Sequence, residues 1–406
     1  MASRAPCDIA MCFVVYAESC DVYRERCERH NVRSWTVATQ KHVPVQTFLR
    51  CAAGIKFKLN KYRSVSSWNW WPSWRPTSTH QLRNAETKIL DCVQNDLWAR
   101  FVSLPTQDKI WTVSVTHKTP QAPPNPASQR PLVMVHGLCG GVGLWIRNLD
   151  PLCRSRPVLV FDLLGFGRSS HPRFPTDPSQ AEQLSVDSIE HWRQALGLES
   201  MILLGHSLGG YLATSYAIQH PKRVKHLILV DPWGFEHIPE DGPAAARPGC
   251  PYWVEGLISV ASRFNPLAGI RAAGPWGPKL IHRFRPDIKS KFEDMFDDQT
   301  MTQYIYHCNA QNPSGEVGFR IMSESLLWAK RPMLDRVHLL PAGLPVTLIY
   351  GARSWMDSKT GNEVAKRRPT SYTQTVVVKG ASHHVYADQP EEFNRVVQSI
   401  CDSVVD

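Results

Sequence analysis

The chain has 406 residues, of which 43% are hydrophobic and 20% charged, a composition typical of a globular protein with one large domain or two small ones. It has no run of 18 or more apolar residues, which argues against a membrane-spanning helix, and its 11 cysteines lack the paired spacing of a metal site. Because that number is odd and no cleavable leader is apparent, we expect free thiols in a reducing, cytoplasmic compartment.

The net charge of +10 comes from one region of the chain. Residues Arg29 to Ala85 include ten Lys or Arg and no acidic residue. A basic stretch of this kind favours an anionic partner surface. No zinc-finger, RNP or helix-turn-helix pattern accompanies the charge, so we expect a phospholipid surface and no nucleic acid.

The N-terminal region divides into two parts. Residues 1–62 show no sustained period and are expected to form an irregular basic extension. Residues 63–95 contain the stretch "SSWNWWPSWRPTS", whose prolines interrupt both helix and strand, followed at 78–94 by an amphipathic helix with Ser78 or Thr79 near its N-cap. Indole rings favour either a groove in the core or a membrane–water interface. The tryptophans in question are Trp68, Trp70, Trp71 and Trp74.

From residue 96 onward, short apolar runs alternate with helical stretches. Residues 98–104 and 109–117 alternate in polarity and predict two opening strands, which a proline-rich loop at 118–131 follows. The later runs are "LVMV", "VLVF", "MILL", "HLILV", "VTLIY" and "TVVV". Buried strands that alternate with helices predict an α/β protein, with a mainly parallel central sheet covered by helices on both faces.

The distance between the fourth and fifth of these runs is too long for one crossover connection. It predicts an inserted helical lid at 240–325, between a first part of the core at 96–239 and a second part at 326–406. Lids of this kind cover active sites.

Ser207 is the strongest candidate catalytic residue. It lies in Gly205-His206-Ser207-Leu208-Gly209, between an apolar run and a helical stretch. G-x-S-x-G in that context is typical of a nucleophile elbow, in which a tight turn presents the serine hydroxyl. We expect the backbone amides of Leu138 and Leu208 to form an oxyanion hole. His136 precedes Leu138 and is expected to have a structural role.

A nucleophilic serine requires a base and a carboxylate that orients the base. "KGASHHVYADQPEEF" follows the last strand and offers His383, preferred here over His384. "VTLIYGARSWMD" offers Asp357 as the acid, since Ser354 stands at the position that often holds it. Asp231, at the end of the preceding strand, is the alternative acid.

His383 and Asp388 also match an H-x4-D acyltransferase motif. The competing interpretation is local, because Asp388 followed three residues later by Glu391 matches an N-cap that opens the last helix.

Taken together, these stretches resemble the α/β-hydrolase fold and, more closely, the fourth and fifth α/β-hydrolase-domain proteins of animals. The resemblance spans about residues 66–400. It is carried by "WPSWRPTSTHQLRNAETKIL", "HGLCGGVGLW", "DLLGFGRSS", "GHSLGGYLATSYAIQHPKRVKHLILVDPWGF", "YGARSWMD" and "HHVYADQPEEFN". The chain departs from the pattern at Ser382, where the family usually has Gly before the catalytic histidine.

The resemblance implies a function at lipid surfaces. It implies that the Trp-rich segment docks on droplets or membranes and that N-acyl- and lysophospholipids are substrates. The coactivator branch of vertebrates has Asn where Ser207 stands, so Ser207 favours the catalytic branch. We therefore expect a serine hydrolase of glycerophospholipid acyl esters, without a metal or redox cofactor.

Two alternatives stay open. One is a lysophosphatidic acid acyltransferase that makes phosphatidic acid with acyl-CoA as co-substrate. The other is a non-enzymatic droplet coactivator whose partner is a triglyceride lipase or a droplet coat protein. In each case we expect a protein peripheral to lipid droplets or to intracellular membranes such as the endoplasmic reticulum or mitochondria.

Overall fold

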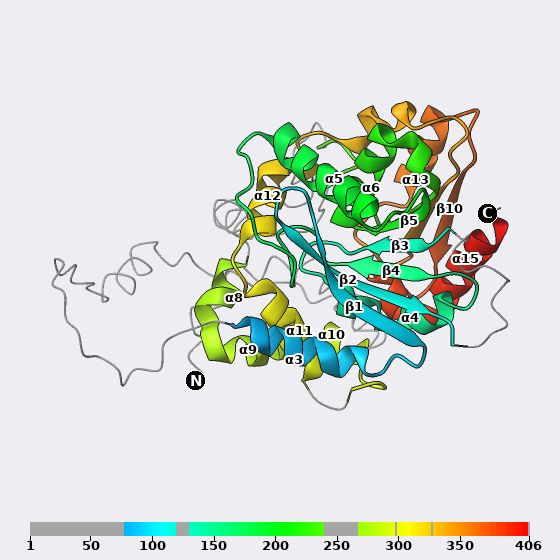
Figure 1. Cartoon of the computed structure of the whole chain (residues 1–406). Helices are drawn as coiled ribbons and strands as arrows, with labels where there is room; N and C mark the ends of the chain where they lie inside the picture. Colours follow the sequence, from blue (N-terminus) through cyan, green and yellow to red (C-terminus); the bar gives the residue numbers. More distant parts are fainter. Residues whose placement is uncertain (1–76, 119–129, 239–266, 297–298, 326–327, 405–406) are drawn as a thin grey trace, which may run out of the picture. The chain divides into compact units, whose positions relative to one another are not determined.

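A central sheet of eight strands organises the computed structural model, which describes residues 77–118, 130–238, 267–296, 299–325 and 328–404 (Figure 1). The strand order is β1-β2-β4-β3-β5-β6-β9-β10. Neighbours from β4 to β10 pair in parallel, whereas β2 pairs antiparallel with both β1 and β4. The strands are β1 (Asp96–Ser103), β2 (Lys109–Thr116), β3 (Leu132–Val135), β4 (Val158–Phe161), β5 (Met201–His206), β6 (Val224–Val230), β9 (Val346–Gly351) and β10 (Thr373–Val378).

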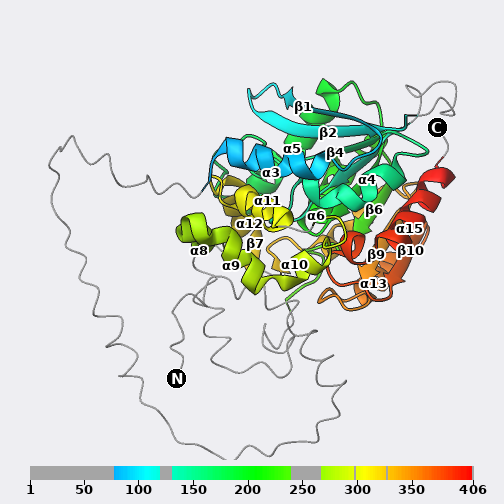
Figure 2. The same ribbon diagram turned by 90° about the horizontal axis from the view of Figure 1, so that it is seen from below.

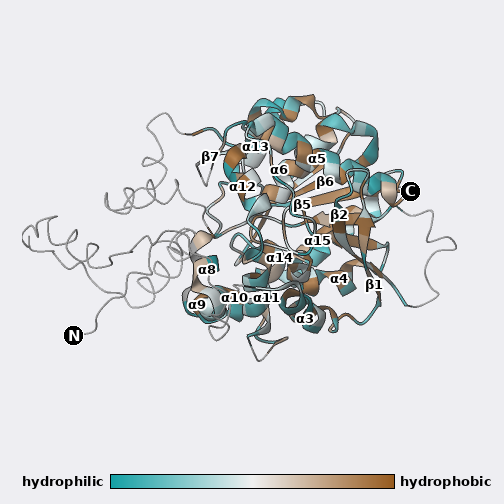
Figure 3. Ribbon diagram, turned by 60° about the vertical axis from the view of Figure 1, so that its left-hand side comes forward, coloured by the Kyte–Doolittle hydropathy of each residue, from teal (hydrophilic) through white to brown (hydrophobic). Residues whose placement is uncertain are grey.

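The short apolar runs form this sheet because side chains of consecutive strand residues point to opposite faces, and both faces are buried along the central strands. On β3, Leu132 and Met134 pack into one hydrophobic core, whereas Val133 and Val135 pack into the other. All four side chains are fully buried. Figure 3 shows central strands such as β5 and β6 in brown, at the hydrophobic end of the scale. The prediction of a mainly parallel α/β sheet is confirmed.

Helices cover both faces of the sheet (Figures 1 and 2). Those that pack into the core of Val133 are α5 (Pro178–Ala195), α6 (Leu208–Gln219) and α13 (Lys359–Arg367). Those that pack into the core of Leu132 are α3 (Thr79–Leu90), α4 (Ile146–Leu152), α14 (Val385–Asp388) and α15 (Pro390–Ser403). The predicted helix after the Trp-rich stretch is therefore α3, and Ser78 caps it by accepting a hydrogen bond from the amide of Gln81 at 3.2 Å.

The connection between β6 and β9 contains a series of short helices, which we call the inserted helices. They are α8 (Ala268–Ala273), α9 (Gly277–Phe284), α10 (Pro286–Ser290), α11 (Thr300–Asn309) and α12 (Ser314–Met322). A short ribbon of β7 (Ser323–Ser325) and β8 (Trp328–Ala329) follows them. α11 packs along α3, and Thr77 Oγ1 lies 2.9 Å from His307 Nδ1 of α11.

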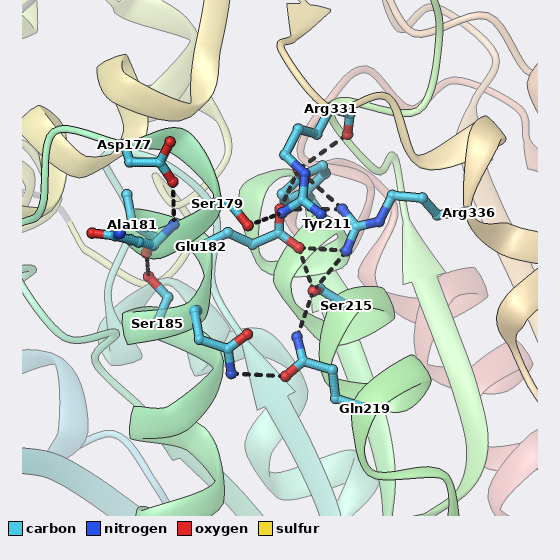
Figure 4. Close-up of polar contacts among 12 residues, drawn as sticks. Asp177, Ser179, Ala181, Glu182, Ser185, Tyr211, Ser215, Gln219, Arg331 and Arg336 are labelled. Atoms are coloured by element: carbon cyan, nitrogen blue, oxygen red, sulfur yellow. Dashed lines mark hydrogen bonds and ion pairs between the residues drawn. The ribbon is translucent and has the colours of Figure 1, made fainter.

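A buried carboxylate fixes the chain where it returns from the inserted helices to the core (Figure 4). Glu182 of α5 is almost completely buried and accepts hydrogen bonds from Arg336 Nη2 at 2.6 Å and Arg331 Nη1 at 3.1 Å. Tyr211 and Ser215 of α6 also donate to it. Burial raises the pKa of Glu182, but the hydrogen bonds and charge of Arg336 and the hydrogen bonds of Ser215 and Tyr211 together hold the pKa below its usual value.

No helix among the described residues is long and apolar enough to cross a bilayer.

Candidate active site

Ser207 occupies a strained turn between β5 and α6. Its φ is 53° and its ψ is −119°, a conformation that non-glycine residues rarely adopt. The turn is so tight that a Cβ atom added to Gly205 would lie 2.3 Å from the carbonyl oxygen of Gly209. The amide of Ser207 donates to the carbonyl oxygen of Val230 at the end of β6, at 3.0 Å. This is the nucleophile-elbow geometry that G-x-S-x-G predicts.

His383 lies in the loop after β10, beside the end of β5. The His206 ring is 4.7 Å from the His383 ring, centroid to centroid, and His206 Nε2 donates to the carbonyl oxygen of His383 at 2.9 Å. The Trp355 ring lies on another side at 5.0 Å. These contacts fix the imidazole next to the residue that precedes the candidate nucleophile.

Asp231 is the carboxylate that orients His383. Its Oδ2 atom accepts a hydrogen bond from His383 Nδ1 at 2.8 Å, so in the neutral imidazole the proton is on Nδ1 and Nε2 is left as the basic atom. Asp231 is fully buried at the end of β6 with φ 45°. Its Oδ1 accepts from the amide of Gly351 at 3.2 Å, and Ser354 Oγ donates to Oδ2.

Burial raises the pKa of Asp231, and the hydrogen bonds from His383, Ser354 and Gly351 act in the opposite direction. The effect of burial is the larger, so the pKa of Asp231 lies above its usual value.

The selection of Asp357 as the orienting acid is therefore corrected. Asp357 is exposed, and its Oδ1 atom accepts a hydrogen bond from the amide of Lys359 at 2.9 Å, beside the start of α13. The physical reason is the direction of the side chains, since the carboxylate of Asp231 reaches His383 Nδ1 whereas that of Asp357 turns back to the amide of Lys359. Ser354, at the position that often holds the acid, instead donates a hydrogen bond to Asp231.

Leu138 and Leu208 occupy the positions from which an oxyanion hole can be built. Leu208 is the first residue of α6, where a backbone amide has no partner within its own helix and the helix dipole favours negative charge. Leu138 lies in the turn after β3, before Cys139, whose φ is 62°.

The turn that carries Leu138 is held from two sides. Asn309 Nδ2 of α11 donates to the carbonyl oxygen of Cys139 at 3.0 Å, and Tyr304 OH of α11 accepts from the amide of Gly143 at 2.9 Å. From the core, Asp162 Oδ1 accepts from the amide of Val142 at 2.9 Å. Sequence reasoning gave no role to Asn309 or Tyr304.

His136 has the structural role that the sequence suggests. It is fully buried, lies with Nδ1 2.8 Å from the carbonyl oxygen of Gly137, and accepts from the amide of Leu163 through Nε2 at 2.9 Å. Burial lowers the pKa of His136 to about 4, so the ring stays neutral and holds two loops together.

Comparison with known proteins identifies the family to which this fold and this candidate site belong. Residues 130–390 match the family described as alpha/beta hydrolase fold. The chain belongs to the α/β-hydrolase family. The parallel strands of the sheet and the strained turn at Ser207 between β5 and α6 are the arrangement expected of a nucleophile elbow in that family.

Among proteins of this family, two groups of relatives are similar over most of the chain. The (lyso)-N-acylphosphatidylethanolamine lipase of Bos taurus is 59% identical over 328 residues, which cover 81% of this chain and 93% of that protein. The 1-acylglycerol-3-phosphate O-acyltransferase ABHD5 of Homo sapiens is 50% identical over 328 residues, with 81% and 91% covered. The resemblance inferred from the sequence is confirmed.

Solved structures support the fold. Carboxylesterase CesB (YbfK) from Bacillus subtilis aligns with a TM-score of 0.55 at 17% identity, covering 80% of this chain and 99% of that chain. A membrane phospholipase A described as a bacterial virulence factor aligns with a TM-score of 0.52 at 19% identity, covering 80% and 91%.

The two side chains of the H-x4-D motif have different partners. Asp388 Oδ2 accepts hydrogen bonds from the amide of Ser382 at 2.8 Å and from Ser382 Oγ at 2.6 Å, and Oδ1 lies 3.4 Å from Lys291 Nζ. His383 uses its Nδ1 for Asp231 instead. The interpretation of Asp388 as an N-cap is wrong, because Gln389 is the N-cap of α15.

Other predictions bear on parts of the chain outside this site. Across the described ranges, no group of three or more His, Cys, Asp or Glu side chains could hold a metal ion. Residues 1–76 lie outside the described residues, and so does the predicted anchor formed by Trp68, Trp70, Trp71 and Trp74.

Proposed function

We propose that this α/β-hydrolase releases acyl chains from lyso- and N-acyl glycerophospholipids by a Ser207–His383–Asp231 mechanism at a lipid surface. The single observation that carries the proposal is the 2.8 Å hydrogen bond between His383 Nδ1 and the buried Asp231, next to the strained turn at Ser207. The substrate class rests on the similarity to (lyso)-N-acylphosphatidylethanolamine lipases.

In the first half of the reaction, Ser207 Oγ attacks the ester carbonyl carbon while His383 Nε2 takes the hydroxyl proton. The carbonyl oxygen becomes an oxyanion, which the amides of Leu138 and Leu208 stabilise. Asp231 stabilises the imidazolium that forms. The carbon–oxygen bond to the glycerol then breaks, and His383 gives its proton to the departing glycerol oxygen, which leaves an acyl group on Ser207.

In the second half, the acyl group passes to water. His383 takes a proton from water as its oxygen attacks the acyl carbonyl, and the tetrahedral adduct releases a fatty acid and regenerates Ser207. Every group in this cycle belongs to the protein or to the substrates, so the mechanism uses no cofactor.

A second activity is supported by the similarity to 1-acylglycerol-3-phosphate O-acyltransferase ABHD5. If the hydroxyl of a lysophosphatidic acid replaces water in the second half, the acyl-enzyme gives phosphatidic acid. Acyl-CoA would then be the acyl donor that loads Ser207, with the thiol of CoA as the leaving group. The two activities thus share one acyl-enzyme.

The test compares wild type with Ser207→Ala on vesicles of N-acylphosphatidylethanolamine and of lysophosphatidylethanolamine, with oleoyl-CoA and lysophosphatidic acid in a parallel reaction. We expect fatty acid release by wild type and none by the variant. Phosphatidic acid formation that is equal in both proteins would contradict the role of Ser207. An absence of turnover in every reaction would instead favour a non-enzymatic coactivator on the droplet.

We also propose that the Trp-rich segment places the enzyme on lipid droplets or intracellular membranes. Its support is the coincidence of four indole rings with the acid-free basic stretch. Replacing the four residues by Ala should release the protein from liposomes in a flotation assay and preserve cleavage of a soluble ester. Unchanged flotation would contradict the proposal. The residues replaced are Trp68, Trp70, Trp71 and Trp74.

A further inference from the structure

The inserted helices meet the loop of His383 at one buried ion pair. Lys291, directly after α10, has a side chain that is only 7% exposed, and its Nζ lies 3.4 Å from Asp388 Oδ1 and 3.4 Å from His384 Nδ1. Asp388 is itself only 11% exposed. One ammonium group of the insertion therefore contacts two residues on the C-terminal side of His383.

Asp388 connects this contact to the other side of the histidine. Through Oδ2 it accepts from the amide and the hydroxyl of Ser382, the residue before His383. The carboxylate thus closes the loop from 382 to 388, with His383 inside it, and Lys291 neutralises the charge on its remaining oxygen. The serine that replaces the usual glycine at 382 adds one of these hydrogen bonds.

Lys291 is held in place for this contact. Arg147 Nε of α4 donates to the carbonyl oxygen of Lys291 at 2.8 Å, which fixes the backbone against the core. Asp287 of α10 also lies near Lys291 Nζ, at 3.5 Å, but it receives both hydrogen bonds of the Arg285 guanidinium at 2.8 Å. Asp287 therefore has a bidentate partner in Arg285, and the ammonium of Lys291 lies between Asp287 and Asp388.

We propose that Lys291 and Asp388 are positioning residues, which join the inserted helices to the loop of His383 and set the orientation of its imidazole. The proposal rests on the proposed function of His383 as the base. In this proposal, Asp388 of the H-x4-D motif supports His383 in both hydrolysis and acyl transfer. The motif is then not a separate acyltransferase site.

The test uses Lys291→Met, Asp388→Asn and the double variant, with Lys289→Met as the matched control. Lys289 is an exposed lysine on α10, two residues from Lys291. Asparagine at 388 can keep its one oxygen as the acceptor for Ser382, and it replaces the charged oxygen that faces Lys291 by a neutral NH2 group, so the ion pair is lost. Two readouts are needed: kcat and KM for acyl release, and the rate at which a fluorophosphonate probe labels Ser207 in each folded protein.

We expect Lys291→Met and Asp388→Asn each to lose about tenfold in kcat and in labelling rate. KM should change little, because neither residue is expected to contact the substrate. The double variant should lose no more than either single variant, Lys291→Arg should retain most of the rate, and Lys289→Met should match wild type. A thermal melt for each variant separates a loss of orientation from a loss of fold.

Two results would overturn the proposal. One is additive losses in the double variant. The other is an Asp388→Asn protein that hydrolyses and is labelled normally but no longer transfers oleate from oleoyl-CoA to lysophosphatidic acid, while Lys291→Met matches wild type. Failure of the proposed function is recognised separately, because wild type itself would then neither turn over nor be labelled at Ser207.

Discussion

Replacing Asp231 by Asn tests the identity of the orienting acid. The backbone at Asp231 has φ 45°, a left-handed conformation that Asn tolerates well, so the fold should survive the change. The side chain is fully buried and receives His383 Nδ1 at 2.8 Å. The substitution therefore removes a negative charge next to the imidazolium and replaces an acceptor oxygen by a neutral amide.

The expected loss in kcat follows from the charge that is removed beside the imidazolium. Two unit charges about 4 Å apart in an effective dielectric of about 20 attract by about 4 kcal/mol. Loss of that stabilisation in the transition state corresponds to about a thousandfold in kcat. Loss of the correct tautomer adds to it, and removal of the aspartate of a Ser-His-Asp triad in another enzyme costs about 10⁴-fold.

The assay is hydrolysis of a soluble ester and of lysophospholipid vesicles, with the fluorophosphonate labelling rate of Ser207 as a second readout. Asp357→Asn is the matched control, because Asp357 is exposed and its side chain accepts from the amide of Lys359, away from His383. We expect Asp357→Asn to retain the wild-type rate. A large loss in the Asp357 variant, with Asp231→Asn fully active, would refute the assignment.

Three further changes test separate parts of the structure. Arg336→Met leaves Glu182 buried with one ion-pair partner fewer and should lower the free energy of unfolding in urea by about 3–5 kcal/mol; an unchanged midpoint would show that the pair contributes nothing. Asn309→Ala removes the donor to the Cys139 carbonyl and should lower kcat more than it raises KM, whereas a pure KM effect would place Asn309 in substrate binding. Gly205→Ala puts a Cβ atom within 2.3 Å of a backbone oxygen and should give little folded protein, so a stable, active Ala variant would contradict the close approach at the elbow.

The parts of the fold that the sequence predicts are those fixed by local pattern. Short apolar runs such as residues 132–135 favour strands that are buried on both sides, and all six runs form strands, although the edge strand β10 is partly exposed. Ser207 is equally local, because its role depends on glycines two residues away on each side and on the strand and helix that flank them. His383 follows from its place after the last strand.

The choice among carboxylates is not local. Asp231 and Asp357 both follow strands that end at the same edge of the sheet, and Asp388 lies five residues from His383, so proximity in sequence and topology permits all three. What decides is the direction of each side chain: the left-handed backbone at Asp231 directs it to His383, whereas the carboxylate of Asp388 bonds Ser382.

Ser354 carries the signal that could have settled this choice. A short hydroxyl at the position where the acid is expected cannot orient an imidazole by charge, but it can donate to a carboxylate that reaches the site from elsewhere. The structure has that arrangement, with Ser354 Oγ donating to Asp231 Oδ2, the atom that also accepts from His383 Nδ1. When the acid is missing directly after β9, the end of β6 is therefore a better candidate position than the loop further along from β9. The reason is that β6 is the parallel neighbour of β9 and ends at the same depth in the sheet.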